Sequence, residues 1–141
     1  MNKNIKRHLV SFIILSIFIL LAIGSIDTDK DRKKVELQSP SYIISAHELY
    51  KHYKNNEVAA DEKFKGRVVV VSGRIRNIGK DIMDQPYIVI GGQGFLDGVQ
   101  CTFTKDQKYL VAQLSKGQYV KVKGEVSGKM GNVLVNKCTM Q

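Results

Sequence analysis

The most constraining feature of this chain is a change, from Arg67 onward, to side chains that alternate between apolar and polar. A period of two residues is that of a β-strand with one buried face, because successive side chains point to opposite sides of the sheet. The segment Tyr119–Val126 shows this most clearly. Its predicted inward residues are Val120, Val122 and Val126, and its predicted outward residues are Tyr119, Lys121, Lys123 and Glu125.

Five strands are predicted from this alternation and from the turn residues between the segments. They are Arg67–Arg76, Tyr87–Ile90, Val99–Thr104, Tyr119–Val126 and Asn132 to about Met140. In the first of them, Val69, Val71 and Ile75 share the predicted inner face, while Arg74 and Arg76 share the outer face.

Two helices accompany the strands. Ser45 and Glu48 have the spacing of a capping box, which predicts a helix to about Lys54 and a stop at Asn55 and Asn56. Its predicted inner residues are Leu49, Tyr50 and Tyr53. A second, short helix is predicted over Asp106–Leu114, with Asp106 as its cap and Leu110 and Leu114 buried.

The predicted order is therefore helix, three strands, helix, two strands. A helix between the third and fourth of five strands is the plan of the OB-fold, a partly open Greek-key barrel. We expect a mainly β domain of this kind over residues 45–141. A mixed α+β sheet with the same element order is the alternative.

The N-terminus holds an apolar segment, Leu9–Ile23, that contains only two polar side chains. Residues 1–25 are expected to form a hydrophobic helix, either an uncleaved signal-anchor or a cleaved signal peptide. Lys3, Lys6 and Arg7 precede it, and such cations stay on the cytoplasmic side. The expectation is a single-pass cell-membrane protein with its N-terminus inside and its domain outside, or a secreted protein if the signal is cleaved.

Residues 26–44 are charged and without apolar periodicity, and they are predicted to be a linker. Asp27, Asp29 and Asp31 have the spacing that opens a calcium loop. However, Arg32 and Gln38 stand where that loop needs Gly and Glu, so no metal site is expected.

Several segments resemble a known bacterial family, tRNA_anti-like, over roughly residues 45–140. They are Asn56–Gly66, Val71–Gly73, Ile78–Ile82, Gly98–Phe103 and Lys116–Gly124. The resemblance implies an OB-fold in an exported or membrane-tethered protein. It implies no activity, because the family name records only a fold similarity to anticodon-binding domains.

No arrangement of residues points to catalysis, so we expect neither an enzyme nor a cofactor. Cys101 and Cys138 would lie on neighbouring strands of an OB barrel, which makes a disulfide possible in an exported protein. Cys101 is expected to face inward, but Cys138 shares its parity with Leu134 and Asn136. A bulge near Asn136 would bring the thiols together, and otherwise both remain buried thiols.

A binding or interaction module is the expected function. OB-folds bind ligands on the face of their second and third strands and with two adjoining loops. This face predicts the candidate ligand-binding residues Arg74, Arg76, Lys80, Tyr87 and Lys129. The expected partners are the membrane, through residues 9–23, and a protein or anionic polymer of the cell envelope. A structural role in an envelope assembly and single-stranded nucleic acid binding are the alternatives. The net charge is +9, but acidic and basic side chains alternate along the domain and form no cationic tail. Nucleic acid is therefore less favoured.

Overall fold

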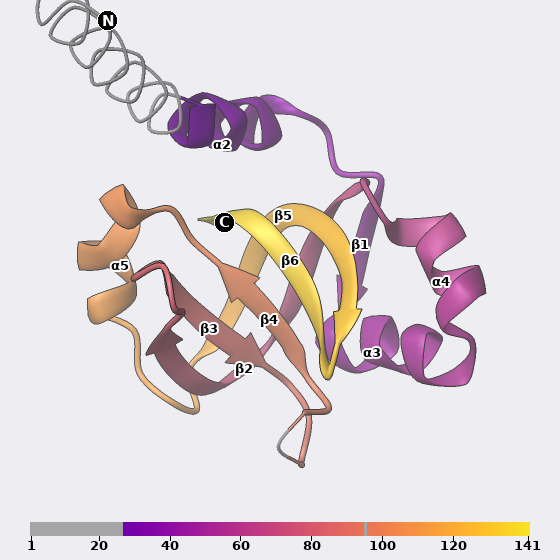
Figure 1. Ribbon diagram of the computed structural model, residues 1–141. Helices are drawn as coiled ribbons and strands as arrows, with labels where there is room; N and C mark the ends of the chain where they lie inside the picture. The colour runs from indigo at the N-terminus through magenta and orange to yellow at the C-terminus, as the bar shows by residue number, and fades with distance from the viewer. Residues whose placement is uncertain (1–26, 95) are drawn as a thin grey trace, which may run out of the picture. The chain divides into compact units, whose positions relative to one another are not determined.

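The computed structural model describes residues 27–94 and 96–141, with side chains from Asp29 onward (Figure 1). The chain divides into two compact units, Met1–Lys30 and Asp31–Gln141, and the structure below is that of the second unit. The predicted N-terminal hydrophobic helix lies outside the described residues. Among the residues that are described, no helix has the length and apolar character needed to cross a membrane.

The elements follow the predicted order with several additions. They are α2 (Asp27–Leu37), β1 (Tyr42–Ser45), α3 (Ala46–Asn55), α4 (Glu57–Phe64), β2 (Val68–Lys80), β3 (Pro86–Ile90), β4 (Val99–Thr102), the 3-10 helix η1 (Lys105–Gln107), α5 (Lys108–Ala112), β5 (Tyr119–Met130) and β6 (Asn132–Met140).

Five strands close into a barrel. Their order is β2-β3-β4-β6-β5, and β5 pairs back onto β2, so that the sheet has no free edge between them (Figure 1). The β4–β6 pair is parallel and the other barrel pairs are antiparallel. The predicted five-stranded OB-fold is confirmed.

The barrel interior is filled by the side chains that the alternation assigned to it. Val69, Val71 and Val122 are fully buried, and Ile75 is 2% exposed. The helix α3 covers one end of the barrel with Leu49 and Tyr53, and Tyr50 is partly buried against the same core. Burial of this apolar surface is the main favourable contribution to the stability of the domain.

Ser45 caps α3 as predicted, but Glu48 reaches back to the Ser45 hydroxyl and not to the main-chain amide that a full capping box uses. The Glu48 amide donates to the Ser45 hydroxyl at 3.2 Å, and the Ser45 hydroxyl donates to the Glu48 carboxylate at 3.1 Å. Asn56 ends α3 as predicted, but its side chain also accepts from the Ala59 amide and so begins α4. This helix was not predicted, because its eight residues bury only Ala60 and Phe64 and leave no clear apolar stripe.

The short helical segment before β5 differs from the prediction in two respects. Asp106 makes no capping hydrogen bond and instead forms an ion pair with Arg32 at 3.3 Å. Leu110 was predicted to be buried but is 41% exposed, and Val111 is buried in its place. The cause is the 3-10 turn η1, which shifts the buried face by one residue; Leu114 still packs against the core.

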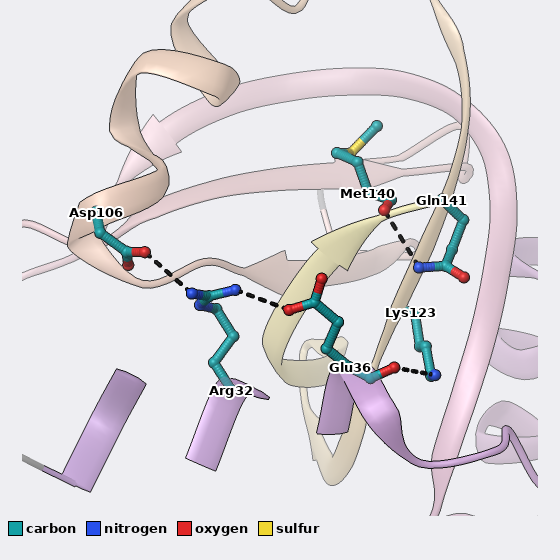
Figure 2. Close-up of polar contacts among 6 residues, drawn as sticks. All are labelled: Arg32, Glu36, Asp106, Lys123, Met140 and Gln141. Carbon is teal, nitrogen blue, oxygen red and sulfur yellow. Dashed lines mark hydrogen bonds and ion pairs between the residues drawn. The ribbon is translucent and has the colours of Figure 1, made fainter. Parts of the chain in front are cut away.

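Two elements lie within the segment predicted to be an irregular linker. β1 pairs in parallel with β2, and α2 buries Val35. The Lys123 ammonium group donates to the main-chain carbonyl of Glu36 near the end of α2 at 2.7 Å (Figure 2). Lys123 points away from the barrel interior as predicted, but it is only 6% exposed because it lies against the end of α2.

Cys138 turns inward through an irregularity in β6. Lys137 has a left-handed φ of 55°, and the β5–β6 register shifts between Lys123 and Glu125. A Cβ atom on Gly124 would lie 2.8 Å from the Cys138 sulfur, so only glycine leaves room for this packing. Cys101 and Cys138 are therefore both buried, as free thiols, in the barrel core.

Candidate functional site

The outer face of β2, β3 and β4 carries a row of polar and apolar side chains. Asn77 pairs with Val89, and Val89 pairs with Gln100 on the next strand. In the neighbouring row Tyr87 pairs with Gly79, and a Cβ atom on Gly79 would lie 2.7 Å from the Tyr87 hydroxyl. The Tyr87 side chain therefore lies across Gly79, which keeps its ring against the sheet beside the row.

A groove of about 360 Å³ runs along this face. A hollow of this size falls at the small end of the range of ligand pockets in proteins. Its lining residues are Arg76, Asn77, Tyr87, Val89, Leu96, Gln100 and Asn132.

Arg76 stands at a β-bulge, because the β2–β3 register shifts between Ile75 and Asn77. The Arg76 guanidinium donates to Asp97 at 3.1 Å, and the other Asp97 oxygen accepts from the Gln93 amide at 2.8 Å and the Gly94 amide at 2.6 Å. The amides of Gly94 and Gln93, and then the Arg76 charge, lower the pKa of the Asp97 carboxyl. The charge of Arg76 is thus balanced by a carboxylate that also holds the β3–β4 loop.

The structure brings together two of the five predicted ligand-binding residues, since Arg76 and Tyr87 both line the groove. The other three do not line it. Arg74 donates to the Gly117 carbonyl at 2.9 Å, and Lys80 pairs with Asp84 in the β2–β3 loop. Lys129 forms an ion pair with Glu57 of α4 at 3.7 Å.

Five lining residues were missed by the sequence analysis. Gln100 could have been found from the sequence, because it is a polar outward residue of a predicted strand. Asn77 was placed in a loop, whereas β2 continues to Lys80. Val89 could also have been found, because it lies two residues after Tyr87 on a predicted strand and shares its face. Leu96 and Asn132 could not, because their place in the groove depends on strand pairing and on the path of the loop.

The groove offers hydrogen bonds and apolar contact but no net charge. Asn77 and Gln100 supply carboxamides, Tyr87 supplies an aromatic ring and a hydroxyl, and Val89 and Leu96 supply aliphatic surface. Asn132 already accepts from the Gly98 amide at 3.2 Å. Within residues 27–94 and 96–141, no cluster of three or more His, Cys, Asp or Glu side chains could hold a metal ion.

A second hollow, of about 570 Å³, lies between α3 and the β3–β4 loop. Its wall on α3 carries His47, Lys51 and Lys54, which repeat every three or four residues and so share one helix face. These three side chains are exposed to solvent, and Asp97 lines the other side. This basic hollow is larger than the groove, but it lies beside the barrel rather than on the strands that OB-folds use for binding.

The fold and the groove define a small OB-fold domain with a candidate binding face. The model of the tRNA_anti-like family matches residues 1–139, and the chain belongs to this family. No curated protein matches the chain.

Solved structures that match the chain include the following three. A "putative nucleic acid-binding lipoprotein" from Klebsiella pneumoniae subsp. pneumoniae MGH 78578 has a TM-score of 0.59 and 18% identity, over 70% of this chain and 90% of that one. The OBody AM3L09, solved bound to hen egg-white lysozyme, has a TM-score of 0.44 and 20% identity over 55% of this chain and 84% of its own. The OBody AM1L10, solved with the same protein, has a TM-score of 0.42 and 22% identity, over 56% and 83% of the two chains.

Proposed function

We propose that this protein is a binding module tethered to the outer side of the cytoplasmic membrane, and that its groove holds a segment of a partner protein of the cell envelope. The tether is the apolar segment Leu9–Ile23, with cations before it and none within it. An uncleaved segment would keep the domain at the membrane.

The observation that carries the choice of ligand is the ion pair between Arg76 and Asp97. Among the described residues that line the groove, Arg76 is the only cation, and its charge is balanced by Asp97. A groove without net charge gives little attraction to a chain of phosphates, for which cationic side chains supply most of the affinity. Amides, one tyrosine and aliphatic side chains instead match the mixed polar and apolar surface of a protein segment.

The proposal includes no catalytic step. A nucleophile needs an adjacent base that a third group orients. Among the described residues that line the groove, no Ser, Cys, His or carboxylate forms such a pair.

Single-stranded nucleic acid or another polyanion is the second candidate ligand. The basic hollow beside α3 favours it, because Lys51 and Lys54 form no ion pair with any described residue. The name of the Klebsiella neighbour points the same way for that protein. A polyanion would bind mainly to α3, and a protein segment would bind mainly to the strands.

A pull-down from solubilised membranes with matched variants separates these ligands. We expect Tyr87→Ala to weaken partner capture by about ten-fold or more, as truncation of a central aromatic contact does. Lys51→Glu should leave capture unchanged, and capture should depend weakly on salt.

The opposite pattern would favour the polyanion. A labelled single-stranded oligonucleotide that binds with a steep salt dependence and loses affinity in Lys51→Glu, but not in Tyr87→Ala, would overturn the proposed ligand.

A further inference from the structure

The β2–β3 loop presents two adjacent apolar side chains to solvent. Ile82 is fully exposed, and Met83 is 68% exposed. Isolated exposed apolar residues are common on proteins, but a pair at the tip of a hairpin loop is less so. Both side chains are therefore available for contact with a partner.

This loop is held in one conformation by its own hydrogen bonds. The Asp81 carboxylate accepts from the Met83 and Gln85 amides, each at 2.9 Å. The Asp81 amide donates to the Gln85 carbonyl at 3.0 Å, and the Asp84 amide donates to the Asp81 carbonyl at 3.0 Å. The side chains of Ile82 and Met83 consequently project from a fixed turn.

The segment formed by η1 and α5 lies beside the loop and extends the same surface (Figure 1). The Phe103 amide, just before η1, donates to the Pro86 carbonyl at 2.8 Å, which joins this segment to the start of β3. On α5, Tyr109 is 84% exposed. Tyrosine prefers the boundary between water and lipid, where its ring and its hydroxyl are both accommodated.

Cations surround these apolar side chains. Lys105 and Lys108 are exposed and form no ion pair with a residue in the described part of the chain. Of the carboxylates at this end, Asp84 pairs with Lys80, Asp106 pairs with Arg32, and Asp81 accepts from two amides of its own loop. Lys80, and then the charges of Lys108 and Lys105, lower the pKa of the Asp84 carboxyl. Lys105 and Lys108 nevertheless form no ion pair with it, so their ammonium groups are open to a negatively charged partner.

We infer that the β2–β3 loop tip and α5 form a surface that rests on the headgroups of an anionic lipid bilayer, with Ile82, Met83 and Tyr109 entering the interface beside Lys105 and Lys108. This inference rests on the proposed tether. Arg32, which contacts η1, follows Ile23 by nine residues. Nine residues of chain span at most about 30 Å, so this end of the barrel remains within reach of the bilayer.

The test uses the full chain reconstituted in phosphatidylcholine vesicles with and without phosphatidylglycerol. An environment-sensitive fluorophore is attached at Ile82→Cys and, as a control, at Val58→Cys. Val58 is 76% exposed and lies on α4, which Figure 1 shows on the opposite side of the barrel from α5. The native Cys101 and Cys138 are fully buried, so the added cysteine is the reactive one.

We expect the probe at position 82 to shift to shorter wavelength and to be quenched by spin-labelled lipid about two-fold or more above the probe at position 58. The double variant Lys105→Glu, Lys108→Glu should lower this quenching to its level without phosphatidylglycerol. Equal quenching at the two positions would overturn the inference. So would shielding of position 82 from aqueous iodide without quenching by lipid, because that pattern indicates a protein contact.

Alkaline carbonate extraction distinguishes failure of the tether from failure of the surface. If the chain remains in the vesicles but the probe at position 82 is exposed to water, the tether is intact and only the lipid contact is refuted. A chain that carbonate releases refutes both.

Discussion

The Arg76 guanidinium and the Asp97 carboxylate are joined by a hydrogen bond of 3.1 Å that links the bulge in β2 to the β3–β4 loop. The same carboxylate accepts from the Gln93 and Gly94 amides. One acidic side chain therefore both neutralises the groove and fixes the loop beside it.

Replacement of Asp97 by Asn should loosen this loop while the barrel stays folded. The amide side chain has one acceptor oxygen in place of two and no charge for Arg76, so the loop amides lose protection. Hydrogen exchange measured by NMR should be at least several-fold faster at Gln93 and Gly94, since a hydrogen bond to a charged group contributes about 1.5–3 kcal/mol. Unchanged exchange at both amides would contradict this role.

The same contact gives a pH dependence with a definite sign. The pKa of Asp97 is lowered in the folded protein, so the ionised carboxylate favours the folded loop at neutral pH. The contribution is complete above the ordinary Asp pKa of about 3.9 and is lost as the pH falls through the lowered value. Protection of the Gln93 amide should persist at pH 5 and decline only below about 4. A decline between pH 7 and 5 would identify another group as its cause.

Lys123→Glu should detach residues 31–37 of α2 from the barrel. Lys123 is buried and donates to the Glu36 carbonyl, where the end of a helix carries partial negative charge (Figure 2). A carboxylate there repels that carbonyl, so exchange of the amides in residues 33–37 should accelerate by about ten-fold or more. Lys121→Glu is the matched control, because Lys121 lies on the same strand and is exposed. Equal exchange in the two variants would show that α2 is held by other contacts.

Val122→Asp should unfold the domain, and Lys121→Asp should not. Val122 is fully buried in the barrel, and an unpaired charge at that position costs enough to remove most of the roughly 5–15 kcal/mol that stabilises a small domain. Thermal melts followed by circular dichroism measure the difference. Similar melting temperatures would be incompatible with the observed strand phase.

Cys101 and Cys138 should form a disulfide when the protein is oxidised, and should do so slowly at neutral pH. Burial, and then the neighbouring Cys101, raise the pKa of the Cys138 thiol, which leaves little reactive thiolate. The bond would add roughly 4 kcal/mol in the chain-entropy model. Intact mass after oxidation, then unfolding and alkylation without reductant, should show no modified thiol. Two modified thiols after prolonged oxidation at high pH would exclude the bond.

The barrel could be predicted because several of its strands show a clear alternation of apolar and polar side chains in their own sequence. Tyr119–Val126 is the clearest case, and all three of its predicted inward valines are buried. β1 could not be predicted, because four residues, Tyr42–Ser45, become a strand only by pairing with β2. The helix α2 is charged along most of its length, and its docking depends on contacts such as Lys123 with Glu36 that no local pattern reveals.

Only two of the seven residues that line the groove were predicted, in part for the same reason. Tyr87 and Arg76 could be found from the fold, since OB strands present such residues on a known face. The charges of Arg76, Lys80 and Lys129 suggested a cationic site, yet each is paired with a carboxylate from another part of the chain. The ion pairs of the folded domain therefore make this face less cationic than predicted, although the groove lies on the predicted strands.

Photo-cross-linking in intact membranes tests most directly whether the groove is the binding surface. A photoreactive amino acid replaces Gln100 in the groove or, as a control, the exposed Glu62 on α4. We predict a protein adduct at position 100 that is absent at position 62 and is lost when Tyr87→Ala is added, while the melting temperature stays unchanged. An adduct of equal yield at both positions, or an adduct at position 100 with nucleic acid alone, would contradict the proposed function.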